Sequence, residues 1–181
     1  MVGEITAARA SVRECPPTPV SPGRSISGVI ERASSGERAA RVAQAVMRAL
    51  PEWFGLEESL LQYVEAARTL PTLIASEATR DVGFLTIKQH TAASAEIVAM
   101  GVLPDRHRRG VGRELLEAAA AQVTADETRL LQVKTLGPSD PDVYYARTRS
   151  FYEALGFIGL EETTAFWGEA NPCLIMVKAL G

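Results

Sequence analysis

The segment RHRRGVGR, residues 106–113, combines clustered arginines with Gly110 and Gly112 directly after an apolar stretch. Glycines at the entry of a helix let backbone amides crowd around an anion, because no Cβ stands in the way. The first amides of a helix have no partner inside the helix and lie at the positive end of its dipole. The spacing therefore predicts an anion site, for which a pyrophosphate is the natural ligand.

Other anion-binding loops fit this segment less well. A P-loop would need Gly-Lys followed by Ser or Thr, which is absent here. A dinucleotide site would need G-x-G-x-x-G near the first strand, whereas the only approximation, GVGREL, lies in the middle of the chain. A capped helix beneath a solvated basic turn is the structural alternative.

Helix and strand patterns alternate around this loop. Apolar residues at helical spacing predict helices over residues 34–50, 57–68, 110–124 and 142–155, with Ser34 or Ser35 capping the first and Asp142 the last. Short apolar runs predict strands over residues 26–31, 72–76, 82–87, 95–103, 130–135, 157–162 and 174–180, with a polar turn around Arg80 and Asp81. This order predicts a mixed α/β fold of a sheet layered with helices.

Length and composition bound the organisation of the chain. The 181 residues are 46% hydrophobic and 23% charged, which is typical of one globular domain. Residues 1–24 differ, because prolines at Pro16, Pro17, Pro19 and Pro22 disfavour both helix and sheet. We therefore expect a flexible proline-rich tail over residues 1–24 and a single domain over residues 25–181.

The charged residues, cysteines and histidines limit the classes of partner that the protein could bind. A formal charge of -3 and a pI of about 5.5 argue against a general nucleic-acid binder. Two cysteines, Cys15 and Cys173, and two histidines, His90 and His107, are too few and too dispersed for a zinc site. With no membrane-length apolar run and no secretory h-region, we expect a cytoplasmic protein without a metal, a nucleic-acid partner or a membrane contact.

Two motifs in order resemble the GCN5-related N-acetyltransferase (GNAT) family. Its pyrophosphate loop reads Gln/Arg-x-x-Gly-x-Gly/Ala, and His107-Arg108-Arg109-Gly110-Val111-Gly112 is similar except that His107 takes the first position. A later family motif, aromatic-Tyr-x-x-x-Gly-Phe, is matched by FYEALGF at residues 151–157. The resemblance covers roughly residues 26–181 and is sharpest over residues 96–157.

The resemblance implies a fold and a cosubstrate. The fold would be α/β, with a GNAT-like mixed, mostly antiparallel sheet of about six to seven strands flanked by about four helices. The cosubstrate would be acetyl-CoA, without a metal. The backbone amides expected at its pyrophosphate are those of Arg108, Arg109, Gly110, Val111, Gly112 and Arg113. The residues matching the family's pantetheine-binding strand, which commonly carries a bulge, are Met100, Val102 and Leu103.

Two residues match the family's catalytic positions. Tyr152 resembles the tyrosine beside the CoA sulfur, where a phenol can protonate the departing thiolate; its alternative is a core tyrosine. Glu96 resembles a glutamate that accepts a proton through water in the histone-acetyltransferase branch; its alternative is a solvated residue at a strand start. Tyr145 stands where the family often has a pantetheine-contacting asparagine.

The acceptor is expected on the face opposite CoA. In the family the loop between the first two helices contributes to this face, and here it contains Trp53, Phe54 and Glu57. Aromatic rings and a carboxylate suit a cationic amine, although the two rings would equally well pack the helix pair together. Tyr144, Trp167 and Asn171 are further candidates.

These observations predict an N-acetyltransferase that transfers an acetyl group from acetyl-CoA to a primary amine of a small molecule or peptide. The amine would attack directly in a ternary complex. The alternative is a catalytically inactive GNAT-like module that senses CoA. A homodimer is expected because the family often dimerises. A nucleic-acid partner for the RHRRGVGR loop is disfavoured by the acidic pI and by the shortness of the basic patch.

Overall fold

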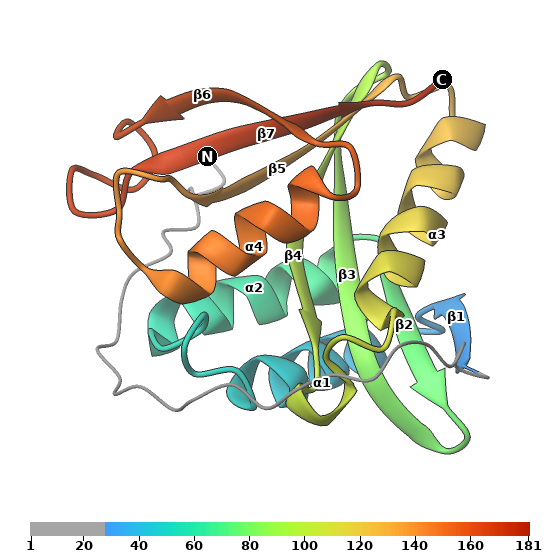
Figure 1. The fold of residues 1–181 in the computed structure, drawn as a ribbon. Coiled ribbons are helices and arrows are strands. Elements are labelled where there is room, and N and C mark those ends of the chain that lie inside the picture. The colour runs from blue at the N-terminus through green and yellow to red at the C-terminus, as the bar shows by residue number, and fades with distance from the viewer. Residues whose placement is uncertain (1–27) are drawn as a thin grey trace.

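A seven-stranded mixed sheet in the order β1-β2-β3-β4-β5-β7-β6 organises the chain (Figure 1). The computed structural model describes residues 28–181, so the predicted proline-rich tail lies outside the described residues. The strands are β1 (Gly28–Arg32), β2 (Thr72–Glu77), β3 (Arg80–Thr91), β4 (Ser94–Val102), β5 (Leu130–Leu136), β6 (Ile158–Thr163) and β7 (Cys173–Ala179). All neighbouring strands are antiparallel except β4 and β5, which are parallel.

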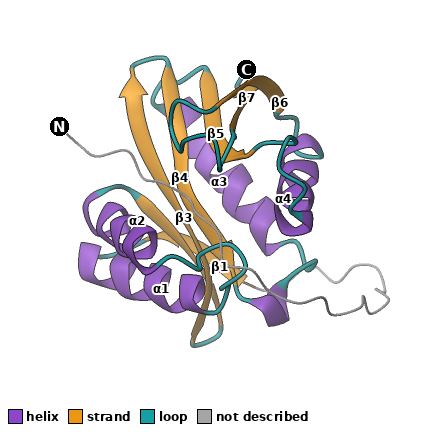
Figure 2. Ribbon diagram, turned by 90° about the vertical axis from the view of Figure 1, so that its left-hand side faces the viewer, coloured by secondary structure: helices purple, strands orange, loops and turns teal. Residues whose placement is uncertain are grey.

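Helices cover both faces of this sheet. Figure 2 shows α1 (Gly36–Arg48) and α2 (Glu57–Thr69) on one face, and α3 (Val111–Ala125) and α4 (Val143–Glu153) on the other. The predicted caps are confirmed: the Ser35 side chain accepts from the Arg38 amide, and Asp142 accepts from the first amides of α4. After α4 the chain turns at Gly156, whose φ of 87° favours glycine.

The predicted turn around Arg80 and Asp81 is wrong. Glu77 and Arg80 are paired, so the hairpin turns at Ala78 and Thr79, and β3 already begins at Arg80. Ala78 takes a positive φ of 52°, which the sequence does not signal because alanine seldom adopts that conformation. The first predicted strand is seen as β1 from Gly28 onward, within the described residues.

The sheet opens in the middle, between β4 and β5. The two strands pair only where Ser94–Ile97 meets Leu130–Val133, and beyond Ile97 they diverge (Figure 1). A bulge accompanies the divergence: Ile97 pairs with Ile87 and Ala99 with Thr86, which leaves Val98 as the extra residue. Within residues 28–181, the second half of β4 therefore keeps β3 as its neighbour but has no strand on its other side.

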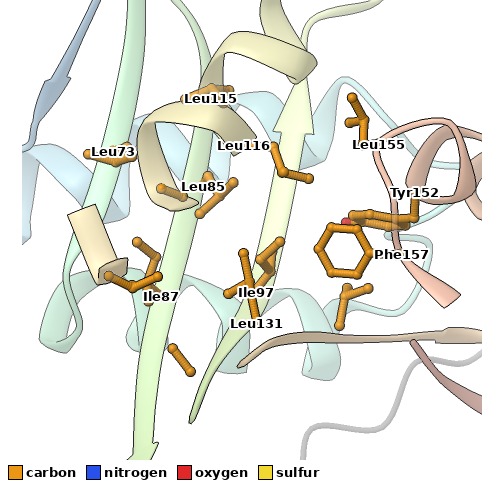
Figure 3. Close-up of a cluster of buried hydrophobic side chains, with 14 of the residues drawn as sticks. Leu73, Leu85, Ile87, Ile97, Leu115, Leu116, Leu131, Tyr152, Leu155 and Phe157 are labelled. Carbon is orange, nitrogen blue, oxygen red and sulfur yellow. The ribbon is translucent and has the colours of Figure 1, made fainter. Parts of the chain in front are cut away.

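Two apolar cores hold the layers together. One lies under α3 and includes Leu85, Leu115 and Tyr152, with the Tyr152 ring 5.3 Å from that of Phe157 (Figure 3). The other lies under α1 and α2, where small residues let α1 approach the sheet closely. Gly101 is one of these, because a Cβ there would lie 2.9 Å from Val46 Cγ1.

Candidate functional site

The consecutive amides of Arg108 to Arg113 have no hydrogen-bond acceptor within residues 28–181, where the first α3 bond runs from the Glu114 amide to the Gly110 carbonyl. These amides belong to the turn between β4 and α3. Unpaired amides at the positive end of a helix dipole favour an anion. The geometry predicted for the loop is therefore present in the backbone.

Backbone conformation shapes this loop. Gly110 caps α3 with a φ of 93°, and Arg108 also takes a positive φ, of 60°. His107, which departs from the family motif, places its Nε2 2.7 Å from the Val102 carbonyl. The imidazole therefore fastens the loop to the end of β4.

The arginines of the loop divide into two groups. The Arg106 guanidinium donates to Glu77 and to Asp105, at 2.7 Å each, so it stabilises the fold of the loop. Arg108 and Arg109 form no ion pair with any residue in the described part of the chain, and Arg113 lies 3.9 Å from Glu117. Positive charge is thus left beside the unpaired amides.

A cavity of about 1100 Å³ extends from this loop through the opening between β4 and β5. Its lining includes Val133 and Tyr152 from the α3 side of the sheet, and Tyr63 from α2 on the other side. The cavity is therefore bordered by residues of both faces. Of the residues predicted for the cofactor, those lining it are Met100, Val102, Arg108, Gly110, Val111, Gly112 and Arg113, whereas Leu103 and Arg109 lie outside the lining.

Tyr152 lines the cavity at its junction with the α3-side core. Its ring packs edge-on against Phe151 and Phe157, and among residues 28–181 its hydroxyl has no hydrogen-bond partner. Burial raises the pKa of Tyr152 well above its usual value. The phenol therefore stays protonated and keeps a donor available at the cavity.

Glu96 is buried but does not line the cavity. Its Oε2 lies 2.5 Å from His90 Nε2 and accepts from Gln132 Nε2 at 3.3 Å, while its Oε1 lies 3.4 Å from Lys134 Nζ. The carboxylate is therefore engaged by side chains of β3 and β5. This network separates Glu96 from the cavity that it was predicted to serve.

Trp53 and Phe54 line the cavity, and Trp53 connects the α1–α2 loop to α4. The Trp53 indole donates to Thr148 Oγ1 at 3.0 Å, and the Tyr145 hydroxyl donates to the Trp53 carbonyl at 3.2 Å. Burial is the main cause that raises the pKa of Tyr145, to about 12. Glu57 lies outside the lining and forms an exposed ion pair with Arg48.

The sequence analysis missed several lining residues, above all Lys134, Thr135 and Tyr63. Thr135 is buried, and its hydroxyl has no partner in the described part of the chain. Alternation along β5 was the available signal, because Leu131 and Val133 face the α3-side core and Lys134 must then face the opposite side. Of the further acceptor candidates, Trp167 lines the cavity, whereas Tyr144 and Asn171 do not.

Two general features of residues 28–181 complete the description. None of their helices is both long and apolar enough to cross a bilayer. The same residues contain no cluster of three or more histidine, cysteine, aspartate or glutamate side chains arranged to hold a metal ion.

Comparison with solved structures shows the fold. A GNAT-family protein from Desulfovibrio desulfuricans has a TM-score of 0.75 and 22% identity, over 86% of this chain and 100% of the other. The ribosomal-protein-S18-alanine N-acetyltransferase of Escherichia coli gives 0.66 and 16%, over 85% and 94%. A GNAT acetyltransferase from Elizabethkingia anophelis with acetyl-CoA bound gives 0.61 and 14%, over 84% and 98%. The expected GNAT-like fold is thus confirmed.

Sequence comparison assigns the family. No curated protein sequence matches the chain significantly. The family model described as the acetyltransferase (GNAT) domain matches residues 68–158, which span the bulged strand β4, the loop of unpaired amides and the helix that carries Tyr152. The chain therefore belongs to the GNAT family of acetyltransferases.

Proposed function

We propose that this acetyltransferase moves an acetyl group from acetyl-CoA to the primary amine of a small molecule or peptide, by direct attack in a ternary complex. The observation that carries the proposal is the run of unpaired amides from Arg108 to Arg113 at the mouth of a cavity that crosses the sheet. Two relatives in fold support it by their chemistry: one holds acetyl-CoA, and the other acetylates an alanine of a ribosomal protein.

The residues of the cavity fit acetyl-CoA. The loop amides would hold its pyrophosphate, with Arg108 and Arg113 adding positive charge. The open edge of β4 after Val98 has backbone groups available to the pantetheine arm, and the unpartnered hydroxyl of Thr135 lies across the opening on β5. Buried polar groups without partners are rare in proteins, so a ligand that satisfies them is the natural explanation.

Bound acetyl-CoA supplies the thioester that the amine attacks. Tyr152 would donate its hydroxyl proton to the departing sulfur, since burial keeps this phenol protonated. The Trp53 and Phe54 side of the cavity would receive the acceptor. Holding the two reactants side by side contributes much of the rate, because it removes the entropic cost of their encounter.

Glu96 is proposed to support the site from outside the cavity. Its carboxylate positions Lys134 and is itself held by His90 and Gln132. The acceptor amine would then lose its proton to solvent, and no dedicated carboxylate base is needed. Glu57, which pairs with Arg48, contributes to the outer rim rather than to the reacting groups.

Two measurements test the proposal. Acetyl-CoA should raise the melting temperature of the protein, because a ligand that binds only the native state stabilises it. A coupled assay for released CoA thiol, run on a panel of amines, should then report turnover. Binding without turnover of any amine would instead favour the CoA-sensing module.

A further inference from the structure

The charged side chains that line the cavity, among residues 28–181, are all basic: Arg106, Arg108, Arg113, Lys134 and Arg147. No aspartate or glutamate of the described residues lines it. A site for a cationic acceptor would be expected to present carboxylates, because buried charges need partners of opposite sign. The lining therefore favours an acceptor that carries negative charge.

Lys134 lies apart from the arginines of the loop and from Arg147, which is exposed on α4 beside the ring of Tyr144, a residue outside the lining. Arg106 pairs with Glu77 and Asp105. Arg108 and Arg113 belong to the loop where the pyrophosphate is proposed to bind, so their charge has a partner there. Lys134 instead projects from β5 on the face opposite α3, where Phe166 of the β6–β7 connection covers it with its ring centroid 4.6 Å from Nζ. Apart from Glu96, whose Oε1 lies 3.4 Å away, Nζ is thus placed to contact the second substrate rather than the pyrophosphate.

The contacts of Lys134 leave part of its ammonium unused. Nζ lies 3.4 Å from Glu96 Oε1, and no acceptor in residues 28–181 makes an aligned hydrogen bond with it. The side chain is 22% exposed, so an approaching group can reach it. The Glu96 carboxylate is itself held by Gln132 and His90, so it fixes the position of Nζ. One contact with Glu96 does not use all three N–H donors of the ammonium.

The remaining walls near Lys134 are aromatic. Tyr63, Phe54 and Trp167 also line the cavity, and the carboxylate beside Lys134, that of Glu96, lies outside the lining. An ammonium head group beside an aromatic ring gains some cation–π attraction, but here Lys134 itself occupies the face of Phe166. A polycationic acceptor would therefore meet a like charge at this end of the cavity.

We propose that the acceptor is a small amine that also carries a carboxylate, an amino-acid-like compound, and that Lys134 binds this carboxylate. The inference rests on the proposed acetyltransferase function. A charge-assisted hydrogen bond to Lys134 would hold the acceptor in the aromatic part of the cavity. The surrounding positive charge would also lower the pKa of the acceptor ammonium, which favours the neutral amine that attacks.

Matched acceptors test the inference on the full-length protein. L-phenylalanine, L-leucine and L-methionine are each compared with the corresponding amino-acid amide, with spermidine as a polycation, in the assay for released CoA. Each pair differs only in carboxylate against carboxamide. We expect kcat/KM to be about tenfold or more higher for at least one free acid than for its amide. The amide has the more easily deprotonated amine, so the comparison is biased against the inference.

Variants locate the effect. Lys134→Met should abolish the preference for the acid, whereas Lys134→Arg should keep it; Arg147→Met, at an exposed lining residue of α4, is the matched control that should also keep it. Lys134→Gln provides a second neutral variant that can still hydrogen-bond Glu96. Melting curves with and without acetyl-CoA verify that each variant is folded.

Several outcomes would overturn the inference. Equal kcat/KM for acid and amide, a preference for spermidine, no turnover of any carboxylate-bearing amine, or an unchanged preference in Lys134→Met would each do so. If acetyl-CoA raises the melting temperature and only neutral or polycationic amines are acetylated, the proposed function stands and only the carboxylate acceptor fails. If acetyl-CoA does not bind, the proposed function itself fails.

Discussion

The two ends of the cavity are built from different parts of the chain. The end between β4 and α3 is made of main chain, from the amides of Arg108–Arg113 and the open edge of β4. The end beneath α2 is made of side chains, contributed by the α1–α2 loop, β5, α4 and the β6–β7 connection. A main-chain site depends on backbone conformation and tolerates changes of side chain, whereas a side-chain site depends on which residues the fold brings together.

Tyr152 gives the largest expected effect, because it lies where the two ends meet. Tyr152→Phe should lower kcat by about 100-fold or more, since it removes the proposed proton donor, while the Kd for acetyl-CoA stays unchanged. Single-turnover kinetics and calorimetric titration separate the two quantities. Unchanged kcat in the folded variant would leave Tyr152 as a packing residue.

The same residue makes a prediction about pH. Burial raises the pKa of Tyr152 above the ordinary value of about 10, so its donor form persists as the pH rises to that value. Loss of the phenol proton should therefore cause no fall in kcat between about pH 8 and pH 10. If kcat does decline in that range and Tyr152→Phe abolishes the decline, the pKa of the Tyr152 phenol is not raised and this prediction is wrong.

The main-chain end should be most sensitive at Gly110. A valine there must adopt a φ of 93°, which a β-branched residue seldom does, while its Cβ would meet only Glu114 Oε1, at 3.8 Å, so we expect backbone strain to be the main effect. Strain of about 1–3 kcal/mol would distort the loop and weaken acetyl-CoA binding by about 5- to 150-fold. Gly168→Val, which has a φ of 78° and open space around it, is the matched control and should leave the Kd unchanged.

Removing an arginine side chain from the same loop should cost less than straining its backbone. Arg108→Ala should raise the Kd for acetyl-CoA by about 3- to 10-fold, and the effect should shrink at high salt because the guanidinium is exposed. Arg109→Ala, outside the cavity lining, should change the Kd by less than about twofold. A larger effect from Arg108→Ala than from Gly110→Val would contradict a main-chain site.

At the side-chain end, two hydrogen bonds join the α1–α2 loop to α4, and one of them runs from the Trp53 indole to Thr148. Trp53→Phe keeps an aromatic ring but loses the bond to Thr148, so the KM of the acceptor should rise by about 3- to 10-fold while the Kd for acetyl-CoA holds. Thr148→Val should have the same effect, and the double variant should add little to either. Glu57→Gln, at the outer rim, is the control expected to change neither constant.

The sequence was informative about the main-chain end because glycine spacing and helix entry are local properties. The motif over residues 107–112 predicted the loop, and Pro51, Asp142 and Gly156 marked the ends of helices. The bulge at Val98 was not visible, since a bulge exists only relative to the register of a partner strand.

The side-chain end was harder to predict for a physical reason. The approach of Lys134 to Phe166, and of Glu96 to His90 and Gln132, depends on strand pairing between segments distant in sequence. Glu96 therefore looked available for catalysis although its oxygens are engaged. Glu57 was assigned to the acceptor by its place in the α1–α2 loop, whereas in the structure it pairs with Arg48.

The opening beside Val98 gives the molecule an inner strand edge in addition to the two outer edges of its sheet. The unpaired N–H and C=O groups of a strand edge can pair with a strand of another chain, which leads to aggregation. Here α4 and the α1–α2 loop, joined through Trp53 and Thr148, border the opening. They leave room for a narrow ligand but not for an added strand. Amide hydrogens of residues 98–102 that point into the opening should therefore exchange with deuterium faster than those that are hydrogen-bonded to β3. A narrow ligand bound in the opening would slow this exchange.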